Sequence, residues 1–396
     1  MHVSQVSGPW RQVAMHTSFL WSSILVLAES GEGWRKLIQL MIKLSRSHPL
    51  DITVELFRMD GDFRFKDILN FQLDVIIPEV SRWKRISYLG WWYDDGFLFL
   101  KPLSKLSAPL LEVLEVSVET DEELFSDEHL CVFAGGAPLL SRFHVDGMKI
   151  TSCLPPISSL TSLQLDIAPE PIDLTLFKEI LTASSTLTHI QIHGDVVNED
   201  QLFEFAANGH TIDLPSLCSL WLEADIYPKH QFFGLISILR CPRLEVMKIT
   251  AGLPVDRPPH SRPRHSYELP IYTSLRSLQL SYIDCTQLGV DLDVTKLPAL
   301  THITFNQCPT AISLLNNLIP TVEGKAVIWP LLQVISLDVG SLPDADVDRL
   351  CKVVSHRTQC GKPIECVRFD TMLVDLIACG NYVRPLRDCV RVETSW

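Results

Sequence analysis

The 396-residue sequence lacks the short motifs that mark the common enzyme classes. It contains no G-x-x-x-x-G-K-[ST] phosphate loop, G-x-G-x-x-G turn, H-E-x-x-H metal helix or G-x-S-x-G nucleophile elbow. Each of these motifs brings together the groups that one class of reaction needs, so their absence argues against nucleotide, metalloprotease and serine-hydrolase chemistry. We therefore expect a protein that is not an enzyme and that uses no cofactor.

The sequence also lacks any C-x-x-C pair, although it contains eleven cysteines. An odd number of scattered cysteines indicates neither a disulfide framework nor a zinc ribbon. Cys131, Cys241 and Cys351 stand at apolar positions, where a free thiol behaves as a small buried hydrophobe. The pattern favours a reducing compartment, and we expect a cytoplasmic or nuclear protein.

Long apolar runs and an excess of positive charge are missing as well. The apolar stretch from Ile24 to Ala28 is too short to span a membrane, and the start MHVSQVSGPWRQ lacks the basic-then-apolar order of a secretory leader. A net charge of −13 argues against nucleic acid or an anionic membrane as a partner. A protein partner with a basic or neutral surface suits this charge better.

The organising feature of the sequence is a repeated L-x-x-L-x-L pattern, which is clear at Leu300, Ile303 and Phe305. Cys308 follows at the place where leucine-rich repeats allow Asn or Cys. The same register recurs at Leu111/Leu114/Val116, Leu140/Phe143/Val145, Leu160/Leu163/Leu165, Leu187/Ile190/Ile192, Leu217/Leu220/Leu222, Leu244/Met247/Ile249, Leu275/Leu278/Leu280 and Leu332/Ile335/Leu337, with weaker copies at Trp83/Ile86/Tyr88 and Ile364/Val367/Phe369. The steps from residue 83 to residue 364 average about 28 residues, close to the roughly 20–29 of leucine-rich repeats. We predict an α/β leucine-rich-repeat solenoid, with a curved parallel sheet on its concave side and helices and turns on its convex side.

Helices are expected between these strands. An apolar stripe predicts a helix from Glu32 to Ser45, followed by a first strand at Ile52 to Leu56 and a second helix from Lys66 to Ile77. Later helices are predicted at Leu124–Phe133, Leu174–Ala183, Glu199–Ala207, Gln231–Arg240, Thr310–Ile319, Asp344–Ser355 and Met372–Ala378. A last strand from Cys389 to Val392 would cap the sheet.

One segment interrupts the repeats. Residues Val255 to Pro270, VDRPPHSRPRHSYELP, are rich in Pro, Arg and His and have no apolar periodicity, which predicts an inserted loop. The loop is interpreted either as a solvated connection or as a basic docking or phosphorylation segment around Ser261 and Ser266.

The residues that flank the last apolar position of each motif should face the concave side, because side chains alternate along a strand. These pairs are Glu115/Ser117, His144/Asp146, Gln164/Asp166, Gln191/His193, Trp221/Glu223, Lys248/Thr250, Gln279/Ser281, Thr304/Asn306, Ser336/Asp338 and Arg368/Asp370. We expect a partner-binding wall centred on residues 164 to 250, with Asp166, Gln191, His193, Trp221, Glu223 and Lys248 as its candidate residues. Asp or Asn at these places also turns the chain after a strand, and Trp221 could pack under a long loop instead, so both explanations stay open.

Metal and thiol sites are not expected. His189 and His193 share one strand face, but at 3.3 Å per residue they are about 13 Å apart, too far for one ion. Cys351 with His356, or Cys360 with Cys366, lacks a third residue to orient a base.

The first thirty residues lie outside the repeat. They predict two short helical faces, the first formed by Val6, Trp10, Val13 and Ala14 and the second by Leu20, Trp21, Ile24 and Leu25. The order V-S-x-x-W-R-x-V-A-x-x-T-x-x-L-W-S-S-I, which runs from Val6 to Ile24, resembles the C-terminal end of an F-box in a large group of fungal F-box proteins with irregular leucine-rich repeats. Ser45 to Ile52 and Ser81 to Ile86 are similar to the R-S-x-x-P-L-D-I and S-x-R-W-R-x-L segments of the same group.

The resemblance implies that residues 1–30 are a remnant of the C-terminal helices of an F-box and that residues 31–396 form the solenoid, with the loop insertion 255–270. It implies a substrate-recognition subunit of an SCF-type ubiquitin ligase, which binds a Skp-type adaptor through Trp10, Leu20 and Trp21 and an unknown target protein through its repeats. The L-P-x-E-[IL]-L-x-x-I-F helix that begins an F-box does not precede these residues, so the F-box is expected to be truncated. The alternative is a leucine-rich-repeat binding module that is not attached to a ligase, with the three residues serving as core.

Overall fold

The computed structural model has a mixed α/β architecture with a long parallel sheet, to which the described residues contribute fourteen strands. The described residues are 7–27, 32–56, 65–119, 129–167, 170–224, 229–251, 269–283, 285, 294–308, 310–316, 328–338, 344–369 and 384–394. They fall into two compact units, which divide between Ile172 and Asp173 except that Ala183–Leu187 belong to the first. No described helix combines the length and the apolarity needed to cross a bilayer.

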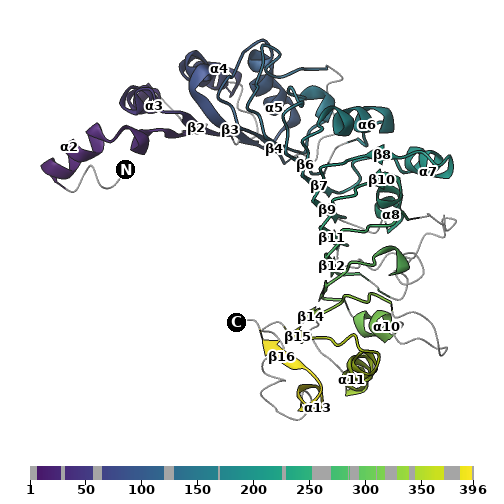
Figure 1. Ribbon diagram of the computed structural model, residues 1–396. Coiled ribbons are helices and arrows are strands. Elements are labelled where there is room, and N and C mark those ends of the chain that lie inside the picture. Colours follow the sequence, from purple (N-terminus) through teal and green to yellow (C-terminus); the bar gives the residue numbers. More distant parts are fainter. Residues whose placement is uncertain are drawn as a thin grey trace. The chain divides into compact units, whose positions relative to one another are not determined.

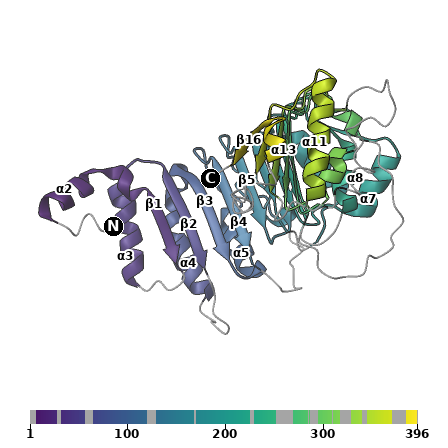
Figure 2. The same ribbon diagram turned by 90° about the horizontal axis from the view of Figure 1, so that it is seen from below.

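Unit 1 contains six parallel strands that pair in chain order (Figure 2). The strands are β1 Ser23–Leu27, β2 Leu50–Leu56, β3 Trp83–Gly90, β4 Val113–Val118, β5 Arg142–Asp146 and β6 Ser162–Leu165. The helices are α2 Gly8–His16, α3 Glu32–Ser45, α4 Phe65–Ile76 and α5 Tyr93–Leu100, with 3-10 turns η1 Ser18–Trp21, η2 Ile77–Arg82, η3 Lys101–Leu103 and η4 Ile150–Ser152. Helices α3, α4 and α5 lie on the same side of this part of the sheet (Figure 1).

Unit 2 repeats the arrangement with eight parallel strands. They are β7 His189–His193, β9 Ser219–Glu223, β11 Val246–Thr250, β12 Ser277–Ser281, β13 His302–Asn306, β14 Val334–Asp338, β15 Cys366–Phe369 and β16 Arg391–Thr394. The helices are α6 Leu174–Ala183, α7 Glu199–Ala207, α8 Lys229–Ile238, α10 Ala311–Asn316, α11 Asp344–Gln359 and α13 Arg384–Arg387, with the 3-10 turn η5 Val294–Lys296 and a small second sheet of β8 Ile212–Asp213 and β10 Leu239–Arg240. Helices α8, α10 and α11 lie on one side of the strands (Figure 1).

The strand register brings equivalent apolar positions of successive repeats into line. In unit 2, Leu220 pairs with Ile190 on one side and with Met247 on the other, and all three side chains are buried. The line continues in the same register through Leu278, Ile303, Ile335 and Val367. Since burying each such side chain stabilises the fold by roughly 1.5–3 kcal/mol, these rows form the core that joins one repeat to the next.

The first leucine of each repeat closes a turn just before its strand. Leu217 donates its N–H to the Leu214 carbonyl, and Leu244 donates to Cys241. The same contact three residues back recurs at Leu111, Leu140, Leu160, Leu187, Leu275, Leu300 and Leu332. Each of these leucines is buried, so the turn directs the chain into the strand and supplies core at the same time.

Most predicted elements are confirmed. Parallel strands occur at the predicted motif positions, and α3, α6 and α7 have the predicted bounds. The helices expected near Lys66–Ile77, Gln231–Arg240, Thr310–Ile319 and Asp344–Ser355 correspond to α4, α8, α10 and α11. The closing strand is present as β16, which begins two residues later than predicted.

Two predictions of secondary structure are wrong, and some elements were not predicted. The second helical face at the N-terminus is not a helix, because Leu20 and Trp21 lie in the 3-10 turn η1 while Ile24 and Leu25 lie in β1, which pairs with β2. The described part of Leu124–Phe133, residues 129–133, is not helical. Helix α5 and the β8–β10 sheet were not predicted. The predicted helix 372–378 and residues 255–268 of the loop lie outside the described residues.

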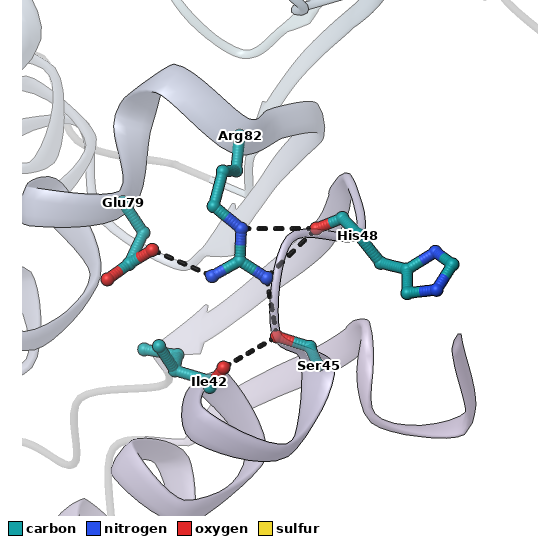
Figure 3. Close-up of polar contacts among 5 residues, drawn as sticks. All are labelled: Ile42, Ser45, His48, Glu79 and Arg82. Carbon is teal, nitrogen blue, oxygen red and sulfur yellow. Dashed lines mark hydrogen bonds and ion pairs between the residues drawn. The ribbon is translucent and has the colours of Figure 1, made fainter. Parts of the chain in front are cut away.

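Arg82 joins the end of α3 to the start of β3 (Figure 3). Its guanidinium donates to Ser45 Oγ at 2.6 Å and to the His48 carbonyl at 2.9 Å from Nη2, and it pairs with Glu79 at 2.7 Å. Ser45 Oγ in turn donates to the Ile42 carbonyl at 2.7 Å. The Arg82 side chain therefore links the last residue of α3, Ser45, to the segment that follows the helix.

Candidate functional site

The candidate site is the face of the sheet opposite the helices, which we call the helix-free face. In β9, Leu220 and Leu222 are fully buried toward the helices, whereas Ser219, Trp221 and Glu223 are half-exposed on the other face. Strands β7, β11 and β13 alternate in the same way. The residues that flank the last apolar position are partly or fully exposed where the structure describes them, except that Ser281 is buried, while Asp370 lies outside the described residues.

In unit 1, the carboxylates of the helix-free face are held by donors on neighbouring strands. Glu115 on β4 accepts hydrogen bonds from Arg85 Nη1 at 3.1 Å and from Ser87 Oγ at 2.5 Å, both on β3. Ser117 Oγ donates to Asp146 on β5 at 2.9 Å. This part of the face therefore compensates much of its own negative charge.

Asp166, a predicted site residue, is the centre of one such cluster in unit 1. Its Oδ2 atom lies 2.7 Å from His144 Nε2 and accepts a hydrogen bond from Gln164 Nε2 at 2.7 Å. Its side chain is only 12% exposed, and Oδ1 has no hydrogen-bond partner among the described residues. Asp166 is thus mainly a bridge between neighbouring strands and presents little surface to a partner.

In unit 2, Trp221 and Lys248 lie side by side on the helix-free face. They are direct partners in the register of β9 and β11, and Gln191 on β7 is opposite Trp221 on its other side. Lys248 Nζ lies 5.2 Å from the centroid of the Trp221 ring, within the range of a cation–π contact. The Trp221 indole N–H is covered and finds no acceptor among the described residues. Trp221 is therefore a half-exposed surface residue whose ring positions a lysine.

His193 and Glu223 form the start of the next row on the same face of unit 2. The two residues are opposite each other in the register of β7 and β9, and both are half-exposed. Gly194 follows His193, and its N–H donates to the Glu223 carbonyl at 2.7 Å, which closes the row at the strand ends. Five of the six predicted site residues, Gln191, His193, Trp221, Glu223 and Lys248, thus belong to one continuous patch within this unit.

The three N-terminal candidates divide into exposed and buried residues. Trp10 on α2 is 56% exposed and Leu20 on η1 is 51% exposed. Trp21 is only 8% exposed, and its indole N–H donates to the Ala14 carbonyl at 2.7 Å. Trp21 therefore holds η1 against α2, while the exposed apolar surface also includes Val13 and Phe19, of which Phe19 was not predicted from the sequence.

The thiols and histidines do not form a reactive constellation in the described residues. Burial raises the pKa of the Cys351 thiol, with smaller contributions from Cys389 and Asp348, which disfavours the reactive thiolate. His356 lies 3.5 Å from the exposed Cys360 sulfur, one helical turn along α11. Within the described ranges, no group of three or more His, Cys, Asp or Glu side chains is arranged to hold a metal ion.

The arrangement presents side chains that could recognise a partner. The main-chain groups of the inner strands are used by the sheet, so a partner at the helix-free face would contact rows of polar side chains and one aromatic ring. Comparison with known proteins adds no relative, since no protein-family model and no curated protein matches this chain.

Proposed function

We propose that this chain is a non-catalytic protein-interaction scaffold of the leucine-rich-repeat kind, which holds a partner protein on its helix-free face. The observation that carries the proposal is the patch of Gln191, His193, Trp221, Glu223 and Lys248, which are half-exposed and in register on three adjacent strands. A partly exposed tryptophan is the kind of residue that anchors protein interfaces, where a few residues, often aromatic, contribute most of the binding energy.

We further propose that the chain is the substrate-recognition subunit of an SCF-type ubiquitin ligase, with the N-terminal segment as its adaptor-binding part. Trp10, Val13, Phe19 and Leu20 are each more than half exposed within α2 and η1. Exposed apolar side chains gathered in one short segment indicate a surface that another protein covers. The resemblance of residues 6–24 to the C-terminal part of an F-box supports a Skp-type adaptor as that protein.

Co-expression with a Skp-type adaptor and a pull-down tests the ligase proposal. The intact chain should retain the adaptor, and Trp10→Ala and Leu20→Ala should each weaken retention while leaving the circular dichroism spectrum unchanged, because both side chains are exposed. Trp21→Ala is the matched comparison, since it should loosen α2 and lower thermal stability as well. If the intact chain retains no adaptor, the ligase proposal is wrong and a scaffold without a ligase remains.

A further inference from the structure

Two rows of the helix-free face of unit 2 contain no carboxylate between β7 and β15. We call them the acid-free rows. The first row is His189, Ser219, Val246, Ser277, His302, Val334 and Cys366, and the second is Gln191, Trp221, Lys248, Gln279, Thr304, Ser336 and Arg368. On a chain with a net charge of −13, such a surface is a local departure from the overall charge. Net charge acts at long range, whereas a contact surface is governed by the groups within a few ångströms.

The corresponding rows of unit 1 differ in a way that identifies the chemistry of the partner. There, Glu115 is a carboxylate in the second row, and Arg85 and Ser87 already donate to it. Donors and acceptors thus compensate each other within the sheet. In unit 2 the second row offers Lys248 and the amide groups of Gln191 and Gln279, and no carboxylate in either row competes for them before β16.

Lys248 is the uncompensated cation of the acid-free rows. Within the described part of the chain, no carboxylate forms an ion pair with its ammonium group, whose contact is the face of the Trp221 ring. A cation over an aromatic ring keeps the N–H groups that point away from the ring available to an acceptor. The other cation of the second row, Arg368, is already paired with Glu393 on β16 at 2.9 Å. An anionic group of a partner would therefore gain the most binding free energy at Lys248.

The remaining carboxylates of this face limit where an acidic partner can lie. Glu223 and Asp338 are in the third row, at the carboxyl ends of β9 and β14. They would repel an acidic segment there, so the segment should follow the first two rows across the strands. The six spaces between seven strands span about 29 Å at about 4.8 Å each, the length of roughly nine extended residues at 3.3 Å per residue.

We propose that the acid-free rows bind an extended, acidic protein segment, one of whose Asp or Glu carboxylates contacts Lys248 while a neighbouring side chain packs on Trp221. This inference rests on the proposed function, because it names the class of partner for the same face. It differs from the expectation based on net charge, which favoured a basic or neutral partner surface.

Fluorescence anisotropy with labelled peptides and the full-length chain tests this inference. The probes are three nine-residue peptides in which Ala alternates with Glu, Gln or Lys. The Glu peptide should bind best, and Lys248→Gln should weaken its binding about tenfold or more, because the glutamine amide cannot supply the charge-assisted hydrogen bond of the ammonium group. Lys248→Glu should weaken it further. Lys84→Gln is the matched control, since Lys84 is an exposed lysine of unit 1 paired with Glu112, and it should leave binding unchanged.

Each other outcome overturns the inference in a recognisable way. If the Gln or Lys peptide binds as well as the Glu peptide and Trp221→Ala abolishes that binding, the face binds proteins but does not select acidic ones. If a fourth peptide, with phosphoserine in place of Glu, binds while the Glu peptide does not, the carboxylate assignment is wrong. If no peptide binds at all, the inference fails, and the adaptor pull-down decides the ligase proposal separately.

Discussion

Arg82 Nη2 donates a hydrogen bond of 2.6 Å to Ser45 Oγ, although 37 residues separate the two in sequence (Figure 3). The two residues belong to two short stretches of sequence, Ser45 to Ile52 and Ser81 to Ile86. In the structure these stretches contact each other through Arg82, which also donates to the His48 carbonyl. A physical reason for both sequence segments is therefore that they fix the end of α3 against the start of β3.

Replacing Arg82 with Ala should destabilise unit 1 by about 2–3 kcal/mol, because the buried Ser45 hydroxyl and the His48 carbonyl lose a charged donor. Arg82→Lys should recover only part of the loss, since one ammonium group cannot reproduce the planar guanidinium geometry. Hydrogen exchange of peptides covering 32–56 measures the effect, and it should be faster in both variants than in the parent chain.

Arg349→Ala provides the comparison for Arg82. Arg349 pairs with Asp346 one turn away on α11, but its side chain is half exposed, and such surface pairs contribute roughly 0–1 kcal/mol. Exchange of the 32–56 peptides should not change in this variant. If Arg82→Ala leaves their exchange unchanged too, the contacts of Arg82 do not stabilise the end of α3.

The strands could be predicted because their pattern repeats. Leu220 and Leu222 must both lie on the helix side of β9, and the same spacing in each repeat makes an accidental match improbable. The start of α7 could also be predicted from the sequence, because Asn is a preferred capping residue. Asn198 caps the helix by accepting a hydrogen bond from the Gln201 N–H.

Strand β1 and helix α5 could not be predicted from a sequence pattern. Ser23–Leu27 is a short apolar run that suits a helix or a strand equally, and pairing with β2 decides the outcome. Helix α5 has no amphipathic pattern, because Phe97, Phe99 and Leu100 are all buried. It also contains Gly96, where a Cβ atom would lie 2.9 Å from the Met148 sulfur, so close packing overrides the poor helix propensity of glycine.

The candidate face was predictable in direction but not in detail. Alternation along β9 placed Trp221 and Glu223 on the correct side of the sheet. The cation–π contact of Lys248 with Trp221 depends on side-chain conformations across two strands, which no single-strand pattern contains. Likewise, the sequence could not distinguish the exposed Leu20 from the buried Trp21, because the hydrogen bond from Trp21 to Ala14 arises only when η1 packs against α2.

Replacing Arg46 with Gly should stabilise unit 1 by about 0.5–1 kcal/mol. Arg46 follows the last residue of α3 and has a φ of 54°, in the left-handed region that glycine adopts without a steric penalty. Arg46→Ala is the matched control and should give no gain, since alanine meets the same restriction as arginine. The midpoint of urea unfolding of the α3 region, followed by pulsed hydrogen exchange, measures both variants; equal midpoints for Gly and Ala would contradict the prediction.

The buried thiol of Cys241 should make the protein less stable at alkaline pH. Burial, followed by the charge of Asp213, raises the pKa of Cys241 from 9.0 to about 12 in the folded chain. Below pH 9 the thiol is protonated in both states. As the pH rises above 9, the unfolded chain gains ionisation that the folded chain resists, so the free energy of unfolding falls by about 1.4 kcal/mol per pH unit until the folded pKa is reached.

Two variants isolate this contribution in urea unfolding measured at several pH values under reducing conditions. Cys241→Ala removes a small buried group and should be less stable by about 1 kcal/mol at pH 8, but its stability should fall less steeply, so that it equals the parent chain near pH 10. Asp213→Asn should lower the folded pKa of Cys241 and end the decline at a lower pH. Parallel curves of stability against pH for Cys241→Ala and the parent chain would mean that the thiol ionises alike in the folded and unfolded states. Any loss of stability at alkaline pH would then come from another buried group, such as Tyr272, whose pKa is raised chiefly by burial.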